Sequence, residues 1–416
     1  MFEMTSGDRD RGFRPLGGVR IIDFSTNMAG PHATMILAHL GADVIKVEPP
    51  AGDDARHWPP ALGDGSIVHA HVNAGKRGIV LDLGKEEGRT VALRLLTGAD
   101  VVLQSMRPGV AARIGIGEEA CRSVSPDALY YDLNAFGAGP EGRALPGYDP
   151  LVQAFSGIMR MNGHEGTPLA RCAPSVIDLG TGQWVATAVL AAILSRHRGH
   201  TVRRVETALV DTAFSLVPYQ ATTAHMTGQR PKRAGSGNPI AAPYQVYPVD
   251  GGEFMLAAPS QRLWERVVAV LGAPALLDDE RFRTPALRSQ NNTALDAEIR
   301  SRLDGADLNT WVARFRAAGV PVTPVPGLEE AIRSPTAVER GTMHELGGVP
   351  LVRLPWMVDG APVLPDRPAP RFGEHTMEVL EELGFSPAER AALLRSGVVQ
   401  AYAAEASPAA PKAAPG

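Results

Sequence analysis

The 416-residue sequence has little cysteine, little net charge and no long uninterrupted apolar run. Its two cysteines, Cys121 and Cys172, are too few for a disulfide framework or a four-thiolate metal site, so we expect a reducing cytoplasm and no metal. The 41 basic and 45 acidic residues give a net charge of −4, which argues against nucleic acid as a partner. The charged N-terminal segment and the missing apolar run predict a soluble cytoplasmic protein with no membrane partner.

The composition is that of an ordinary globular protein. Hydrophobic residues make up 44% and charged residues 21%, and the length is enough for two or three lobes around a sizeable core. Lysine is scarce, with five residues among the 41 basic ones, which agrees with a GC-rich bacterial genome. The Ala/Pro-rich segment 401–416 predicts a disordered tail.

Short β-type runs alternate with helix-type segments between Val19 and Leu133. The runs are VRIIDF, DVIKVE, RGIVLDL, DVVLQ and ALYYDL. This rhythm predicts an α/β fold, a Rossmann-like parallel sheet wrapped by helices. We expect one helix over Pro31–Leu40, with proline at its first position and Gly41 as a left-handed cap. A second, largely buried helix is expected from near Leu179 to Arg196.

A segment rich in Gly, Pro and basic residues, 228–243, indicates a linker or mobile loop, and a smaller α+β lobe follows it. That lobe should begin with two strands joined at Asp250-Gly251-Gly252. Helices are expected at Trp264–Leu271, Asn292–Leu303 and Leu308–Ala318, then a strand in GVPVTPV, and a final helix pair within 375–397.

Common nucleotide and hydrolase motifs are missing from the sequence. Gly115-Ile116-Gly117 has the outline of a dinucleotide fingerprint, but it follows a helix-like stretch where a strand is required. No phosphate-binding P-loop, nucleophile elbow or zinc helix motif is present.

Asp178 is the most informative carboxylate, because it stands at the mouth of the long apolar helix in SVIDLGTG. The simplest interpretation of Asp178 is a helix N-cap. The alternative interpretation is a carboxylate nucleophile, held ionised by the helix dipole and nearby amide donors. Local sequence leaves both interpretations open.

An ordered series of short segments between Gly18 and about Val399 carries a family resemblance. The segments are GVRIIDFS from Gly18, AGP from Ala29, LGADVIKVE from Leu40, Lys76-Arg77 with LDL from Leu81, RPG from Arg107, Phe136-Gly137, PGYD from Pro146, APY from Ala242 and GEHT from Gly373. In this order they resemble the class III CoA-transferase family (the CaiB/BaiF group), which includes formyl-CoA and carnitine CoA-transferases and the α-methylacyl-CoA racemases.

The resemblance implies that Asp178 is the catalytic aspartate of a CoA-transferase, with acyl-CoA and a carboxylic acid as substrates. CoA is then a substrate and product, and no cofactor is tightly bound. The reaction would pass through an aspartyl mixed anhydride and an aspartyl-CoA thioester. Racemase members carry histidine where this chain has Tyr148, and a phenol with an ordinary pKa of about 10 is a poor proton shuttle, so transferase is favoured. A 2-methylacyl-CoA racemase and a non-catalytic acyl-CoA binder remain as alternatives.

The resemblance also implies the binding residues. The acyl pocket would contain Met28, Trp58, Tyr148 and a mobile glycine loop, Gly235-Ser236-Gly237, which otherwise reads as an interdomain linker. CoA would be bound by Asn27, Ala29, Lys76, Arg77, Met106 and Arg113. The chain departs from the family pattern at three places. Met28 stands where the family often has glutamine, and Pro49 or Pro50 stands where formyl-CoA transferases have an arginine. Ser105-Met106 replaces the usual Asn-Phe. Arg56 could supply the missing cation.

The family fold is an interlocked homodimer. The resemblance therefore predicts a large CoA-binding domain from residues 1–225 and 341–400, with a linker and small domain at 226–340 between its two parts.

Overall fold

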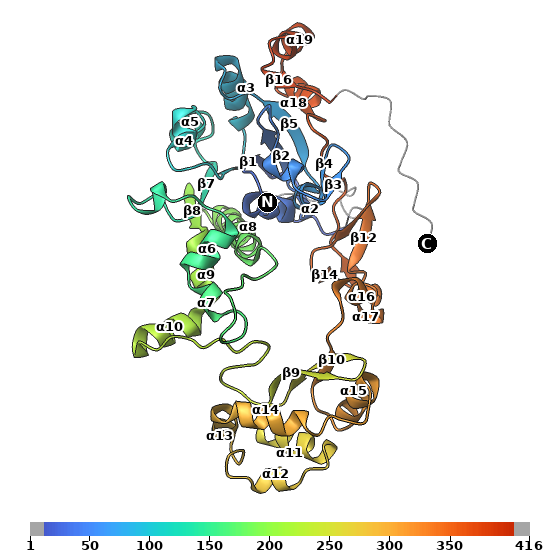
Figure 1. The fold of residues 1–416 in the computed structure, drawn as a ribbon. Helices are drawn as coiled ribbons and strands as arrows, with labels where there is room; N and C mark the ends of the chain where they lie inside the picture. Colours follow the sequence, from blue (N-terminus) through green and yellow to red (C-terminus); the bar gives the residue numbers. More distant parts are fainter. Residues whose placement is uncertain (1–11, 403–416) are drawn as a thin grey trace. The chain divides into compact units, whose positions relative to one another are not determined.

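The computed structural model describes residues 12–402, which form two compact units (Figure 1). The first unit comprises the chain up to Val152, Pro174–Leu216 and the chain from Glu339 onward. The second comprises Gln153–Ala173 and Val217–Val338. The predicted tail, 401–416, lies almost wholly outside the described residues.

The second unit takes in more of the chain than the predicted small domain, because Gln153–Ala173 packs with the segment after α10 (Pro218–Thr227). Arg233 donates to the carbonyl oxygens of Asn162 and Thr167, and the Gly235 amide donates to the carbonyl of Gly163. These bonds tie a segment that precedes α8 (Val176–His197) to one that follows it.

A seven-stranded sheet forms the centre of the first unit, in the order β16-β5-β2-β1-β6-β7-β8. Its strands are β1 (Arg20–Phe24), β2 (Asp43–Glu48), β5 (Arg77–Leu81), β6 (Val101–Gln104), β7 (Leu129–Asn134), β8 (Arg204–Ala208) and β16 (Val399–Gln400). All neighbours pair in parallel except β16, which pairs antiparallel with β5. The mostly parallel α/β sheet expected from the sequence is confirmed, and all five predicted strands are present.

Helices cover this sheet, as its apolar strands require. The helices of the first unit are α1 (Ala29–His39), α2 (Ile67–Asn73), α3 (Glu86–Leu96), α4 (Val110–Arg113), α5 (Glu118–Val124), α6 (Asp149–Phe155), α8 (Val176–His197), α9 (Leu209–Ser215), α18 (Thr376–Glu382) and α19 (Pro387–Arg395). Ile22, Ile79 and Val102 on the strands are fully buried, in one core with Leu95 of α3 and Leu380 of α18. Short two-stranded pairs complete the unit: β3 (Ala61–Leu62) with β4 (Gly65–Ser66), β12 (Met343–Leu346) with β13 (Val349–Val352), and β14 (Met357–Val358) with β15 (Ala361–Pro362).

Helices α1 and α8 pack closely against each other. Gly182 permits the approach, because a Cβ there would lie 2.7 Å from the ring of His32 and 2.8 Å from the carbonyl oxygen of Ala29. Helix α1 begins at Ala29, so Pro31 is its third residue and not its first as predicted, while Gly41 has the expected left-handed φ of +99°.

Helix α8 alone among the described helices has the length and mean hydropathy of a membrane-spanning helix, which the sequence analysis did not anticipate. A core helix passes the same test. Helix α8 contacts α1, α9 and β8 in the first unit, but only 39% of its apolar stretch is buried, so the expectation of a largely buried helix is wrong.

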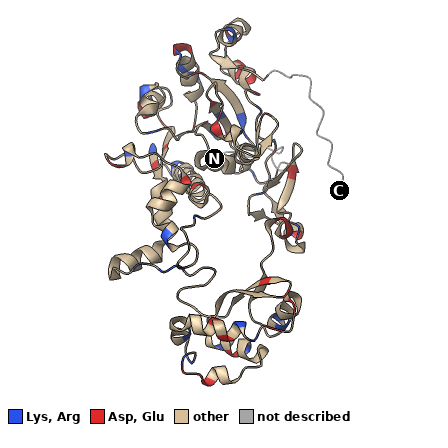
Figure 2. Cartoon of the chain, in the orientation of Figure 1, with Lys and Arg blue, Asp and Glu red and all other residues tan. Residues whose placement is uncertain are grey.

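The second unit contains a three-stranded antiparallel sheet, β11-β10-β9, formed by β9 (Tyr244–Val249), β10 (Gly252–Ala257) and β11 (Val322–Pro324). Its helices are α7 (Ile158–Met161), α10 (Pro218–Thr227), α11 (Gln261–Val270), α12 (Ala275–Asp278), α13 (Pro285–Gln290), α14 (Asn292–Arg300), α15 (Leu308–Ala317) and α16 (Leu328–Ala331), and α17 (Pro335–Glu339) leads out of the unit. Trp264, Phe254 and Phe315 are fully buried in its core. Acidic and basic residues are interspersed along both units (Figure 2).

Candidate active site

A cavity of about 220 Å³ opens at one edge of the central sheet in the first unit. Its lining comes from the loops after β1, β6 and β7, which are neighbours in the sheet. After β1 the chain builds β2 and β5 on one side, and β6, β7 and β8 on the other. The cavity therefore lies at the carboxyl ends of the strands, at the point where the winding reverses, which is where open α/β sheets bind ligands.

Seven of the residues predicted to act or bind line this one cavity. They are Asp178, Met28, Trp58, Tyr148, Asn27, Ala29 and Met106. They come from separate loops and from α8, so the fold brings together residues up to 151 positions apart in the sequence.

Asp178 is the third residue of α8 and does not cap the helix. The carboxylate of Asp149, at the start of α6, takes that role: its Oδ2 accepts from the amides of Ile177 at 2.8 Å and Asp178 at 3.2 Å. The N-cap interpretation of Asp178 is therefore wrong. Among the described residues, none donates a hydrogen bond to the Asp178 carboxylate, which remains available to a ligand.

The environment of Asp178 disfavours its charge. Burial raises the pKa of Asp178, and the nearby Asp149 carboxylate raises it further, to about 7. The structure thus contradicts the expectation that helix dipole and amides hold Asp178 ionised, because the first amides of α8 bind Asp149. A half-buried carboxylate with a pKa near neutrality is typical of a catalytic group.

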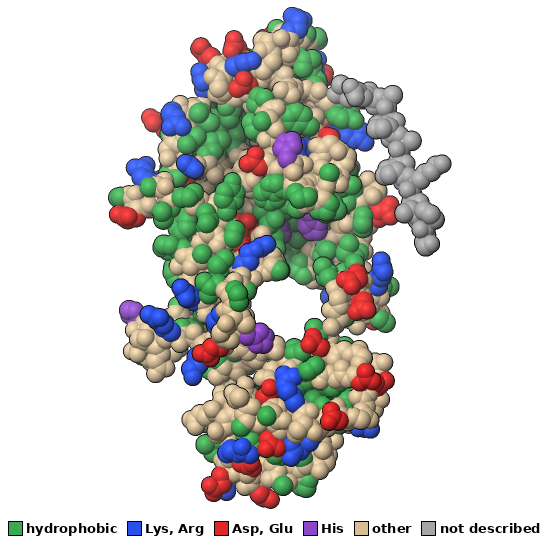
Figure 3. All heavy atoms as spheres, viewed as in Figure 1, with side chains coloured by type: hydrophobic (Ala, Val, Ile, Leu, Met, Phe, Trp, Pro, Cys, Tyr) green, Lys and Arg blue, Asp and Glu red, His purple; other side chains and the backbone are tan. Residues whose placement is uncertain are grey.

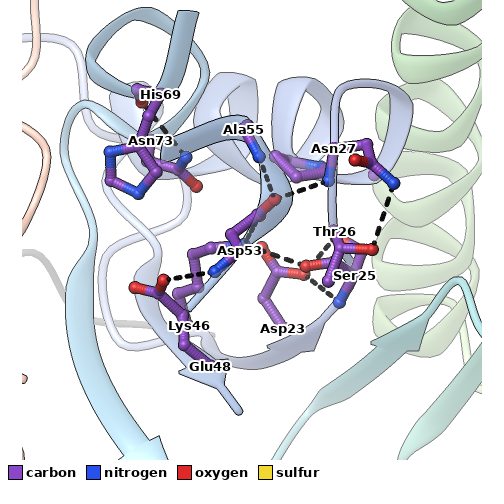
Figure 4. Close-up of polar contacts among 12 residues, drawn as sticks. Asp23, Ser25, Thr26, Asn27, Lys46, Glu48, Asp53, Ala55, His69 and Asn73 are labelled. Carbon is purple, nitrogen blue, oxygen red and sulfur yellow. Dashed lines mark hydrogen bonds and ion pairs between the residues drawn. The ribbon is translucent and has the colours of Figure 1, made fainter. Parts of the chain in front are cut away.

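A buried ion pair holds the loop after β1 (Figure 4). Lys46 and Asp53 are fully buried, with Nζ 2.7 Å from Oδ2, and Lys46 also donates to the carbonyl of Ser25. The other carboxylate oxygen of Asp53 accepts from the amides of Asn27 and Ala55. Asn27 has a φ of +68°, a left-handed conformation that non-glycine residues seldom adopt. Asp53 therefore fixes the strained residue that leads into Met28 and α1.

A second buried ion pair accounts for Lys76. Its Nζ lies 3.1 Å from Asp23 Oδ2 and donates to the side chain of Asn73 and the carbonyl of Pro31. Asp23 also accepts from Ser25 and Thr34, and these interactions lower its pKa to about 2 against the opposing effect of burial. Lys76 is fully buried, so it does not face the cavity as a CoA-binding cation would.

The other predicted cations also lie outside the cavity lining. Arg56 is buried and binds Glu48 with two hydrogen bonds of 2.7 Å. Arg77 binds Asp43 on one side and two glutamates of α18 on the other. Arg113 is exposed on α4. In this structure Arg56 and Arg77 therefore serve as structural ion-pair partners.

The sequence analysis missed several residues of the site. Arg107 lies on the cavity wall and is exposed, and Asn134, Phe136 and Gly137 line it after β7. Arg107 stands in the RPG segment and Phe136-Gly137 is itself a family segment, so those segments could have identified them. Asp149 stands in PGYD but gave no local sign that it caps a helix 28 residues later.

The glycine loop belongs to the second unit, whereas Asp178 belongs to the first. Gly235 has a φ of +60°, and a Cβ there would collide with the imidazole of His164. Within residues 12–402, no three His, Cys, Asp or Glu side chains gather in a way that could hold a metal ion.

The left-handed conformation of Asn27 generates a prediction. Asn27→Gly should retain thermal stability and CoA affinity, because glycine adopts this conformation freely. Asn27→Ala removes the same side-chain groups but should cost about 1–2 kcal/mol of stability and weaken CoA binding roughly fivefold. Thermal unfolding and calorimetric titration with CoA measure both, and equal behaviour of the two variants would contradict a conformational role.

A family model described as CoA-transferase family III matches residues 16–376. The chain is 32% identical to the succinate–glutarate CoA-transferase of Agrobacterium fabrum, over 89% of this chain and 96% of that protein. It is also 32% identical to the acetyl-CoA:oxalate CoA-transferase of Acetobacter aceti, over 90% and 97%. A CaiB/BaiF family protein from Brucella suis has a solved structure with a TM-score of 0.81 and 30% identity, covering 89% of this chain and 99% of that one. The chain belongs to CoA-transferase family III and is an enzyme of that family.

Proposed function

We propose that the protein moves CoA from an acyl-CoA donor to a carboxylic acid acceptor, with Asp178 as the nucleophile. The observation that carries this is a half-buried carboxylate, free of hydrogen-bond donors among the described residues, in a cavity at the switch point of the sheet. CoA is substrate and product, as in the reactions that name the two relatives above.

The proposed reaction begins when an Asp178 oxygen attacks the thioester carbonyl of the donor. The C–S bond breaks, CoA leaves as a thiolate, and a mixed anhydride joins Asp178 to the acyl group. The thiolate then attacks the side-chain carbonyl of Asp178 and releases the acyl group as a free acid, which leaves an aspartyl-CoA thioester. An acceptor carboxylate repeats these steps in reverse, so the thioester energy is conserved.

Water would hydrolyse both intermediates, so the cavity must be closed during turnover. We propose that Gly235-Ser236-Gly237 is a loop that changes conformation at each step, since glycines suit such a loop. Trp58 and Met28 would form the apolar wall near the thioester, and Asn27, Ala29 and Met106 would contact the CoA chain. Arg107 is a better candidate than Lys76 for a phosphate-binding cation, because it is exposed on the cavity wall.

Asp178→Asn tests the nucleophile. We expect transfer to fall by at least about 10³-fold while CoA binding persists, because the amide cannot form the anhydride. Mass spectrometry after incubation with acyl-CoA and hydroxylamine should find the hydroxamate on Asp178 in the unmutated enzyme.

Asp211→Asn is the matched control, because Asp211 is an exposed carboxylate in the first turn of α9 and should be dispensable. Modification of any other residue would overturn the assignment. Solvent deuterium entering a 2-methylacyl-CoA without an acceptor acid would instead indicate a racemase. Normal CoA binding without exchange of labelled acid would indicate a binder.

The pKa of Asp178 sets a pH dependence. Attack requires the carboxylate, so kcat/KM should rise with pH through about 7. Asp149→Asn removes the neighbouring charge while its side-chain oxygen can still accept from the α8 amides. The acidic limb should therefore move to lower pH, though only in part, because burial is the larger cause of the raised pKa. A pH–rate profile of kcat/KM measures this shift. The control Asp211→Asn should leave the acidic limb in place. An unmoved acidic limb in Asp149→Asn would exclude an electrostatic effect of Asp149 on Asp178.

We also propose that the chain forms the interlocked homodimer of its family. Large apolar side chains are exposed on the first unit, among them Trp184 (52%) and Leu194 (53%) on α8 and Phe214 on α9, and Figure 3 shows apolar side chains gathered on one face of that unit. Light scattering should give twice the 44.1 kDa of one chain, and a monomer at micromolar concentration would count against the proposal.

A cytoplasmic location is proposed because Cys121 and Cys172 are free thiols.

A further inference from the structure

A second cavity, of about 740 Å³, lies in the first unit beside the cavity that contains Asp178. Its walls are α1, α2, α8 and residues 352–356 after β13. It is more than three times as large as the Asp178 cavity, and the proposed transfer reaction gives it no role so far.

The two cavities share a partition. Met28 lines both of them, and the consecutive α8 residues Asp178 and Leu179 line one each. The N-terminus of α1 packs directly on α8 at this point, where Gly182 meets Ala29 and His32. Met28 and the first turn of α8 therefore border both cavities. Methionine is unbranched and flexible, which suits a movable partition.

The walls of the larger cavity are mostly apolar, and their polar members are His32, His71, Ser175, Gln183, Thr187 and Arg353. Met35, Ile36 and Val72 contribute buried side chains. The cavity's one arginine, Arg353, is occupied, because its guanidinium donates to several backbone carbonyls, including that of Leu354 at 2.6 Å. Burial lowers the pKa of His32 to about 4 and also lowers that of His71, which leaves both imidazoles neutral at pH 7.

We propose that this cavity receives the hydrocarbon tail of the acyl group, so that the enzyme acts on monocarboxylic acids with an apolar chain of several carbons. The inference rests on the proposed transfer at Asp178. The carboxyl end of the substrate would stay at Asp178 and the chain would pass Met28. A dicarboxylic acid would have to bury its second charge among mostly apolar walls, which is costly, and the one arginine of the lining, Arg353, already donates to backbone carbonyls.

Binding of acyl-CoA thioesters to Asp178→Asn tests the cavity independently of catalysis. Affinity should rise about three- to fourfold for each added methylene from acetyl-CoA to octanoyl-CoA. Leu190→Trp, which fills the cavity from α8, should weaken octanoyl-CoA at least tenfold and acetyl-CoA less than twofold. Ala191→Trp is the matched control, at the next position of α8, exposed and outside the cavity lining, and should change neither.

Turnover of the unmutated enzyme with a series of straight-chain acids and dicarboxylates should follow the same order. Affinities that do not depend on acyl-chain length would overturn the inference; this is the result expected if a second protein subunit fills the cavity. Equal losses of affinity for both thioesters in Leu190→Trp would also overturn it. Because these are binding measurements, they stand apart from the fate of the transferase proposal. If Asp178 is not acylated, the transferase proposal is wrong, whereas an effect of acyl-chain length on binding would still support the cavity proposal.

Discussion

The pocket depends on one buried ion pair, Lys46 with Asp53. Both side chains are fully buried, and removing one partner of such a pair typically costs about 3–5 kcal/mol because the other charge is left unpaired. The same carboxylate binds the amide of Asn27, which enters a left-handed conformation just before α1. The same atoms therefore determine the stability of the sheet edge and the conformation of the loop after β1. A substitution that destabilises the ion pair should also change the conformation of that loop.

A second consequence concerns where positive charge is available. The four lysines and arginines discussed around β1, β2 and β5 would all suit a CoA phosphate by type, yet Lys46, Lys76, Arg56 and Arg77 each bind a carboxylate. The cations that build the fold are thus distinct from those open to a ligand, such as Arg107 on the cavity wall. A single sequence does not separate the two classes, because the pairing partners come from other strands and helices.

Much of the fold was predictable because its signals are local. The runs VRIIDF and DVIKVE are short, rich in β-branched residues and alternate with helix-type segments, and the turn at Gly251-Gly252 separates two strands. Asp178 was identified by its place in an ordered set of family segments. Its electrostatics were not predictable, because they arise from burial and from Asp149, both of which exist only after the chain has folded. The larger cavity was also missed, because its walls join α1, α2, α8 and residues 352–356.

The contact between Asp149 and the start of α8 also bears on the energetics of the proposed covalent step. Before reaction, an ionised Asp178 is buried beside a second carboxylate, and both effects raise its pKa to about 7. Formation of the anhydride would turn this side chain into a neutral ester-like group, so the cost of burial and the repulsion from Asp149 would both be relieved. The raised pKa also makes the carboxylate a stronger nucleophile than an exposed aspartate. The position of Asp149 would thus raise the free energy of the unacylated enzyme and so favour acylation. The amides of Ile177 and Asp178 keep Asp149 in place.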